Sequence, residues 1–184
     1  TDEMAAVAAA VADLPQPEPL EVSLDTGSCS GAALTAHGSG RLALPVWQQG
    51  ERPFLTAGGG IVVDGTGRAV QNGVETGSDG QGVVVDLAIP CGPAPAAGWP
   101  VLIFMDGTGG SAQAGWISEL GADLPFAVIS IAPMYSSDRL TVAPPPFDDP
   151  GFQFFNYLNP LAARTNLVQQ AADVLYLQRL AGGL

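Results

Sequence analysis

Residues 106–110, Asp-Gly-Thr-Gly-Gly, carry the clearest chemical signal in the chain. They directly follow the apolar run 101–105, and glycines after a strand let the backbone turn sharply and bring N–H groups close to a ligand. A helix expected at roughly 112–124 would place its N-terminus beside these groups, where the helix dipole favours negative charge. The pattern therefore predicts a backbone site for an anion or an oxyanion. An ordinary glycine-rich turn between a strand and a helix is the alternative that the spacing leaves open.

The same glycines do not predict a nucleotide site. Gly107, Gly109 and Gly110 form a Gly-x-Gly-Gly pattern that lacks the Lys and Ser/Thr of a P-loop and the later glycine of a dinucleotide fingerprint. The chain has no Lys, and its formal net charge of -12 repels nucleic-acid phosphates and anionic lipid surfaces. We therefore expect no nucleic-acid partner and no cofactor.

The N-terminal half is expected to hold one helix and several strands. Residues 2–13 predict a short Ala-rich helix, which Pro15, Pro17 and Pro19 break into an extended linker. Residues 25–40 are rich in Gly, Ser and Ala, which is typical of a loop or of a poorly patterned strand. Strands are predicted at 42–47, where Pro45 favours an edge, at 61–63 and 69–71 around a turn at 64–67, and at 82–89, ending at Pro90.

The C-terminal half predicts a parallel sheet. The continuous apolar runs 101–105 and 126–132 suit buried parallel strands, and the order strand–loop–helix–strand–loop–helix is that of a βαβα unit. Residues 133–162 are expected to be irregular. A last helix at about 163–180 is expected to bury an apolar stripe at helical spacing, formed by Leu167, Ala171, Val174, Leu175 and Leu177 or Gln178.

These elements predict an α/β chain in two parts. Residues 1–40 form an N-terminal helix with a Pro/Gly-rich extension. Residues 41–184 form the main domain, with β-hairpins over 41–90 and the parallel βαβα unit over 99–184.

The stretch 98–110 resembles the oxyanion strand and loop of secreted bacterial lipase-like α/β-hydrolases, in which the loop usually reads His-Gly-Thr-Gly-Gly. Residues 129–133 look like the end of the next strand of that sheet. The resemblance covers roughly residues 40–184. Its other matching segments are 46–50, 58–60 and 155–160, together with Arg164, Asn166, Gln169 and Asp173.

The resemblance implies the front part of an α/β-hydrolase fold and part of a serine ester hydrolase acting on carboxylic esters, lipids or polyesters. It implies an oxyanion or substrate-binding group made of Asp106, Gly107, Thr108, Gly109, Gly110 and Tyr135. The family's G-x-S-x-G elbow does not occur in the chain, so the serine, acid and histidine would come from a separate segment, and the chain alone would be inactive. The alternative is a non-catalytic binding or surface protein with the same fold.

The resemblance also places the strand at 101–105 between the strand at 126–132 and the nucleophile strand. Without that third strand, one edge of a very apolar strand would be unpaired, which is an aggregation hazard. We therefore expect a second polypeptide, carrying the rest of the domain, as a partner.

Two departures from the family pattern favour the non-catalytic alternative. Asp106 stands where the family usually has His, and a carboxylate beside an oxyanion site repels the developing charge unless it is paired or points away. Residues 136–139, Ser-Ser-Asp-Arg, replace the more usual His-Gly-x-Arg.

The cysteine pair, Cys29 and Cys91, predicts one disulfide in an oxidising compartment, since there is no CxxC motif; two unrelated thiols are the alternative. We therefore expect a secreted, periplasmic or cell-surface protein. No apolar run approaches the ~20 residues of a membrane span.

The remaining candidates each have two interpretations. Asp138 and Arg139 pair with loop groups, and Asp173 with Arg164 or Arg179, or all are solvated surface charges. Asp148 and Asp149 hold calcium or form a plain turn, which is the favoured interpretation, so no metal site is expected. His37 is expected at the surface. An acyl pocket or core packing accounts for the aromatic residues Phe147, Phe152, Phe154, Phe155 and Tyr157.

Overall fold

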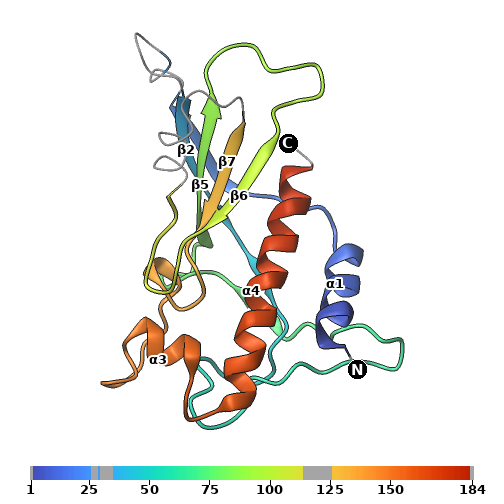
Figure 1. Ribbon diagram of the computed structural model, residues 1–184, viewed down its shortest axis with the longest axis vertical. Helices are drawn as coiled ribbons and strands as arrows, with labels where there is room; N and C mark the ends of the chain where they lie inside the picture. Colours follow the sequence, from blue (N-terminus) through green and yellow to red (C-terminus); the bar gives the residue numbers. More distant parts are fainter. Residues whose placement is uncertain (1, 26–28, 30–34, 114–125, 183–184) are drawn as a thin grey trace.

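The computed structural model describes residues 2–25, 29, 35–113 and 126–182 (Figure 1). Two helices lie together on one side, and a twisted sheet rises above and beside them. In chain order the elements are α1 (Glu3–Asp13), β1 (Leu20–Asp25), β2 (Thr35–Leu42), β3 (Leu44–Val46), β4 (Gly73–Glu75), β5 (Val83–Pro90), β6 (Val101–Met105), β7 (Ala127–Ile131), the 3-10 turn η2 (Ser137–Arg139), α3 (Pro150–Phe155) and α4 (Pro160–Ala181).

The main sheet has five strands in the order β1-β2-β5-β7-β6. β6 and β7 are parallel, with Val101 opposite Ala127 and Met105 opposite Ile131, whereas β5 and β7 are antiparallel. The sheet is therefore mixed, and with its helices it places the chain in the α/β class. The predicted parallel pair at 101–105 and 126–132 is confirmed.

The two parallel strands differ in burial. Val128 to Ile131 of β7 are buried, as predicted, because β5 and β6 flank this strand. β6 is the last strand of the sheet in the described part of the chain, and Val101 and Leu102 are exposed. The prediction that 101–105 is a buried strand is therefore wrong for the described residues, since one edge of β6 has no strand beside it.

The segment predicted as a loop or poorly patterned strand at 25–40 contributes most of β2. β2 pairs with β5 over eight residues, from Thr35 opposite Pro90 to Leu42 opposite Val83. Gly38 suits this strand because a Cβ there would lie 2.5 Å from the Ser23 carbonyl oxygen of β1. Cross-strand pairing therefore outweighs the weak local β-propensity of this segment.

The β-structure expected over 41–90 is only partly present: the strand predicted at 42–47 is divided between β2 and β3, and the strands predicted at 61–63 and 69–71 are reduced to isolated bridges. The turn at 64–67 is confirmed: Val63 bridges Ala69, and the Asp64 carboxylate accepts hydrogen bonds from the Thr66 and Arg68 N–H groups at 2.8 and 3.1 Å. β3 pairs with β4 in a separate two-stranded sheet, which agrees with Pro45 on an edge strand.

The N-terminal helix is confirmed as α1. The Asp2 carboxylate caps it by accepting from the Met4 and Ala5 N–H groups. Its apolar face packs with α4 in a cluster that includes Trp47 and Ala172. α1 and α4 lie side by side in Figure 1, so the start and end of the described chain meet in one layer.

The stretch 133–162 is more ordered than predicted. It contains η2 and α3, and α4 begins at Pro160, three residues before the predicted start, because the Asn159 side chain accepts a hydrogen bond from the Ala162 N–H. Short helices set by caps leave no apolar periodicity in the sequence, which is why α3 was not predicted.

The predicted apolar stripe of the last helix is only partly confirmed, because Leu175 packs against the core cluster shared with α1. Leu167 is 60% exposed and Val174 is also exposed, whereas Leu177 is buried as expected. The buried face of α4 carries polar as well as apolar side chains, and each of the polar ones has a hydrogen-bond partner. Its buried residues are Ala162, Thr165, Asn166, Gln169, Ala172, Asp173, Leu177 and Leu180.

Cys29 and Cys91 form a disulfide, as predicted, with their Cα atoms 5.5 Å apart. Within the described ranges, no helix is long and apolar enough to cross a membrane. Most of the helix predicted at 112–124 lies outside the described residues.

Candidate functional site

The glycine loop, residues 106–110, leaves β6 at the end where β7 also finishes. In the described chain this is the shared carboxyl edge of the two parallel strands. The loop after β7 lies against it, because the Gly109 N–H donates to the Ser136 hydroxyl at 2.8 Å. Ligand sites in α/β proteins commonly form at this edge of the sheet.

The Asp106 carboxylate is turned back onto its own loop. Its Oδ1 accepts from the Gly107 N–H at 2.7 Å, and its Oδ2 accepts from the Gln113 side-chain amide at 2.8 Å. A Cβ at position 110 would lie 2.4 Å from Asp106 Oδ2, so Gly110 is required for this arrangement. Asp106 therefore holds the loop together.

The loop tip is a tight turn. The Gly110 N–H donates to the Gly107 carbonyl at 2.9 Å, and Gly109 has φ +88°. A residue at positive φ in the third position is the mark of a type II turn, and glycine adopts it without steric cost. Residues 107–109 are exposed.

The backbone donors of the loop are mostly in use. Gly107, Gly109 and Gly110 already donate to Asp106, Ser136 and Gly107 respectively. Among the described residues, the Thr108 N–H has no acceptor. Of the predicted group, the structure therefore leaves Thr108 as the donor that can reach a ligand without rearrangement.

Tyr135 lies in the interior, away from the exposed loop tip. It is fully buried in a cluster with Met134 and Phe154, and the Arg52 guanidinium lies 4.8 Å from the centre of its ring. Burial raises the pKa of Tyr135, and Arg52 opposes this. Its neighbour Ser136, which sequence reasoning did not select, is the residue that contacts the glycine loop.

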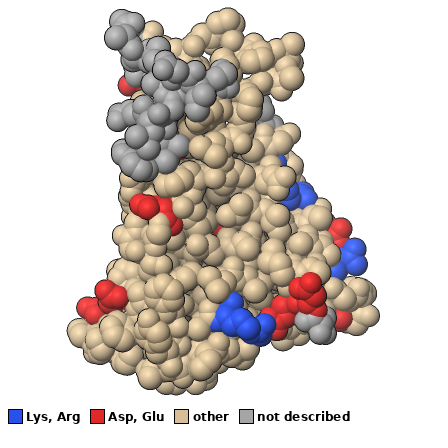
Figure 2. All heavy atoms as spheres, viewed as in Figure 1, with Lys and Arg blue, Asp and Glu red and all other residues tan. Residues whose placement is uncertain are grey.

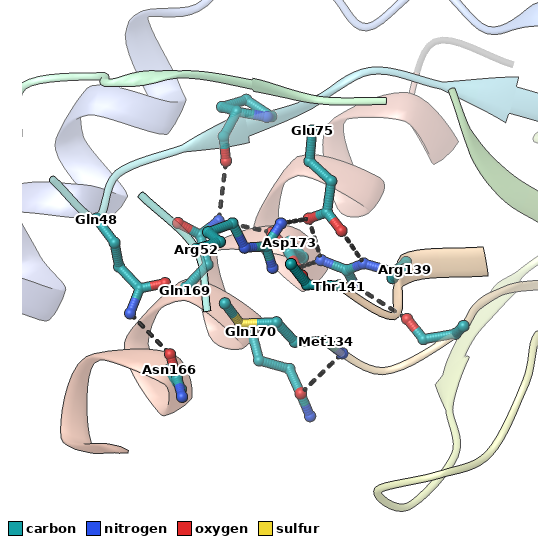
Figure 3. Close-up of polar contacts among 12 residues, drawn as sticks. Gln48, Arg52, Glu75, Met134, Arg139, Thr141, Asn166, Gln169, Gln170 and Asp173 are labelled. Carbon is teal, nitrogen blue, oxygen red and sulfur yellow. Dashed lines mark hydrogen bonds and ion pairs between the residues drawn. The ribbon is translucent and has the colours of Figure 1, made fainter. Parts of the chain in front are cut away.

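A buried charge network lies behind these loops (Figure 3). Arg139 donates from Nε and Nη2 to the two Glu75 oxygens at 3.0 and 2.8 Å, from Nη2 to Asp173 at 2.7 Å, and from Nη1 to the Ala132 carbonyl at 2.9 Å. Arg52 adds an ion pair with Glu75 at 2.8 Å. Two guanidinium groups thus balance two carboxylates in the interior.

This network corrects the expected pairing of Asp173. Its partner is Arg139, whereas Arg164 pairs with Glu3 and Arg179 donates to the Ala12 and Leu14 carbonyls. The solvated-charge interpretation is wrong for Arg139 and Asp173, whose side chains are 0% and 1% exposed. Sequence reasoning named both residues but missed Glu75.

The network governs how its acids titrate. Burial opposes the ionisation of Glu75, but Arg139 and Arg52 outweigh it and lower the pKa of Glu75 to about 2. Burial raises the pKa of Asp173, and Arg139 opposes the effect. Of these two acids, Glu75 is therefore the one whose charged form its partners stabilise more.

Polar side chains of α4 extend the network towards β3. Gln169 accepts from the Trp47 N–H at 2.8 Å and donates to the Pro45 carbonyl at 2.8 Å and to Asp173 at 2.9 Å. Gln48 donates to Thr165 and Asn166. These bonds fix α4 against the segment that follows β3.

The aromatic residues between Phe147 and Tyr157 form neither an acyl pocket nor a single core cluster. Phe154 is buried as core, but Phe152, Phe155 and Tyr157 are exposed, Tyr157 by 72%. Phe152 makes edge contacts with Phe147 and Tyr157 at centroid distances of 6.3 and 6.2 Å. The exposed rings therefore pack on one another at the surface.

The other candidates behave as structural residues. Asp149 caps α3 by accepting from Gly151 and Phe152, which agrees with the plain-turn interpretation. His37 is partly exposed, as a surface residue can be, but it lies on the strand β2 and not in a loop. No group of three or more His, Cys, Asp or Glu that could hold a metal occurs in the described part of the chain.

An apolar hollow of about 550 Å³ lies at the other end of the sheet, where β6 and β7 begin. Its lining includes Leu87, Trp99 and Val101. It is therefore separated from the glycine loop by the length of β6. Figure 2 shows wide uncharged areas and no extended basic surface among the described residues on the face drawn.

No family model, curated protein or solved structure matches this chain.

Proposed function

We propose that this chain supplies the oxyanion loop of a serine ester hydrolase, and that another segment supplies the nucleophilic serine, the acid and the histidine. The observation that carries the proposal is the exposed Thr108 N–H, which has no acceptor among the described residues and stands on a glycine turn after a parallel strand. A fixed backbone donor of this kind stabilises the oxyanion of a tetrahedral intermediate.

The sheet order supports the proposal. β6 comes before β7 in sequence but lies outside it in the sheet, which is the position that the lipase-like resemblance implies for this strand. The open edge of β6 is where that resemblance places the nucleophile strand. The exposed apolar side chains of Val101 and Leu102 support a partner segment there.

The contacts of the Asp106 carboxylate reduce the repulsion that this charge would exert on an oxyanion nearby. The carboxylate is held by the Gly107 N–H and the Gln113 amide, so its charge is partly compensated by two donors. An Asp in place of the family's usual His is therefore compatible with a loop held in one conformation.

The first test measures mass and activity together. The intact mass of the native protein is measured by mass spectrometry under non-denaturing and then denaturing conditions. Its esterase activity is assayed with p-nitrophenyl butyrate. We expect polypeptide beyond these 184 residues to accompany the chain, and the ester to be hydrolysed. A mass of 18.7 kDa in both conditions with no hydrolysis overturns the proposal.

A matched pair of variants tests the donor itself. Thr108→Pro removes the N–H, and a type II turn accepts proline at this position. We expect kcat to fall roughly 10²–10³-fold, as for other oxyanion donors. Thr108→Ala keeps the N–H and should retain kcat. Equal activity of the two variants would exclude Thr108 as the donor.

The second candidate is a non-catalytic binding or surface protein of the same fold. The observation that favours it is the use of the Gly107 and Gly109 N–H groups by Asp106 and Ser136, which leaves fewer donors for an oxyanion. A native mass above 18.7 kDa, together with no hydrolysis of the ester, would favour this candidate.

A further inference from the structure

The loop after β7 has a constrained backbone conformation on both sides of Ser136. The flanking residues Tyr135 and Ser137 have φ +60° and +52°, a region that costs about 1–3 kcal/mol for a non-glycine residue and persists only where the surroundings enforce it. The Ser136 carbonyl accepts from the Arg139 N–H at 2.9 Å. Ser136 itself is fully buried.

The enforcement comes from the charge network. Arg139 is bound by Glu75 and Asp173, and its Nη1 reaches back to the Ala132 carbonyl at the end of β7. The ring of Tyr135 is packed beneath Arg52, which is paired with Glu75. Both ends of the segment 132–139 are therefore fixed to the same buried charges.

One hydrogen bond connects this segment to the glycine loop. The Ser136 hydroxyl accepts from the Gly109 N–H at 2.8 Å, immediately beside Thr108. A second bond acts in the same way farther along, where the Ser130 hydroxyl of β7 accepts from the Gln113 N–H at 3.0 Å. The exposed turn is thus attached to β7 and its loop at two points.

We propose that Ser136 is a positioning residue, which holds Gly109 so that the Thr108 N–H points to the reacting oxygen. This inference rests on the proposed hydrolase function. Misplacement of a donor by about 1 Å can reduce the rate by two orders of magnitude, so a single anchoring bond is sufficient to affect kcat.

The test compares Ser136→Ala, Ser136→Thr and Ser137→Ala in the intact, assembled protein. Ser136→Ala removes the acceptor, and Ser136→Thr keeps a hydroxyl. Ser137→Ala makes the same chemical change at an exposed side chain one position away. Amide hydrogen exchange at Gly109 is measured together with kcat and KM, and a thermal melt checks that each variant folds.

We expect Ser136→Ala to speed exchange at Gly109 about tenfold, the value of one typical hydrogen bond, and to lower kcat by about tenfold or more with KM nearly unchanged. Ser136→Thr should restore both quantities, and Ser137→Ala should match the parent. Unchanged exchange in Ser136→Ala overturns the anchoring contact. Faster exchange with unchanged kcat overturns the positioning role.

Failure of the proposed function gives a different result. A parent protein that hydrolyses no ester removes the catalytic role of Ser136, while exchange at Gly109 still decides whether the contact exists. The two failures are therefore distinguishable in one set of measurements.

Discussion

The guanidinium of Arg139 and the carboxylate of Asp173 lie 2.7 Å apart, with both side chains excluded from solvent. They come from η2 and the middle of α4, 34 residues apart in sequence. The pair joins the loop that carries Ser136 to the longest helix, so its loss should affect the whole fold.

Asp173→Ala should lower the free energy of unfolding by about 3–5 kcal/mol, because it leaves a buried guanidinium partly uncompensated. Urea denaturation measures this value. Glu3→Ala is the matched control: it breaks the more exposed pair with Arg164 and should cost no more than about 1 kcal/mol. Similar losses in the two variants would contradict a structural role for the buried pair.

Acid should destabilise the protein through Glu75. Its pKa is lowered from 4.5 to about 2 in the folded state, so its contribution is fully present above pH 4.5 and is lost as pH falls towards 2. At about 1.4 kcal/mol per pKa unit, this contribution is about 3 kcal/mol.

Comparison of the parent with Glu75→Gln between pH 5 and pH 2 isolates this effect. The difference in unfolding free energy between the two proteins should shrink by about 3 kcal/mol over this range. The comparison is needed because burial raises the pKa of Asp173 and Asp138, and these groups act in the opposite direction. A constant difference at all pH values would show that Glu75 does not titrate as described.

Two glutamines of α4 provide a paired test of its polar buried face. Gln169→Ala leaves the Trp47 N–H and the Pro45 carbonyl without their partner, so it should destabilise by about 2–4 kcal/mol. Gln178→Ala changes an exposed side chain on the same helix and should stay within about 0.5 kcal/mol. If Gln178→Ala costs as much in thermal unfolding, the buried hydrogen bonds of Gln169 do not explain the loss.

The disulfide should contribute to stability through the unfolded chain. It closes a loop with a sequence separation of 62 residues, for which chain entropy predicts about 4 kcal/mol. The double variant Cys29→Ser/Cys91→Ser should therefore unfold at lower urea concentration, and a reducing agent should shift the parent but not the variant. A parent that is insensitive to reduction would contradict this contribution.

The sequence alone determined the features that depend on local chemistry. The apolar runs at 101–105 and 126–132 predict the parallel pair of strands, because short continuous apolar runs are typical of parallel strands. The glycines at 107, 109 and 110 predict a sharp turn, and the two cysteines predict their own pairing. The proposed ester hydrolase function is not determined in this way and stays a proposal.

The positions of the polar side chains depend on contacts between segments that are distant in sequence. Asp173 on α4 has only the neutral Gln169 amide as a partner on its own helix, and its charge is balanced by Arg139, which also binds Glu75 of β4. Leu167 has the right type and spacing for a core position, yet it is exposed, whereas the polar residues Gln169 and Asp173 of the same helix are buried. Long-range contacts of this kind depend on how distant segments meet in space, and helical periodicity contains no information about that meeting.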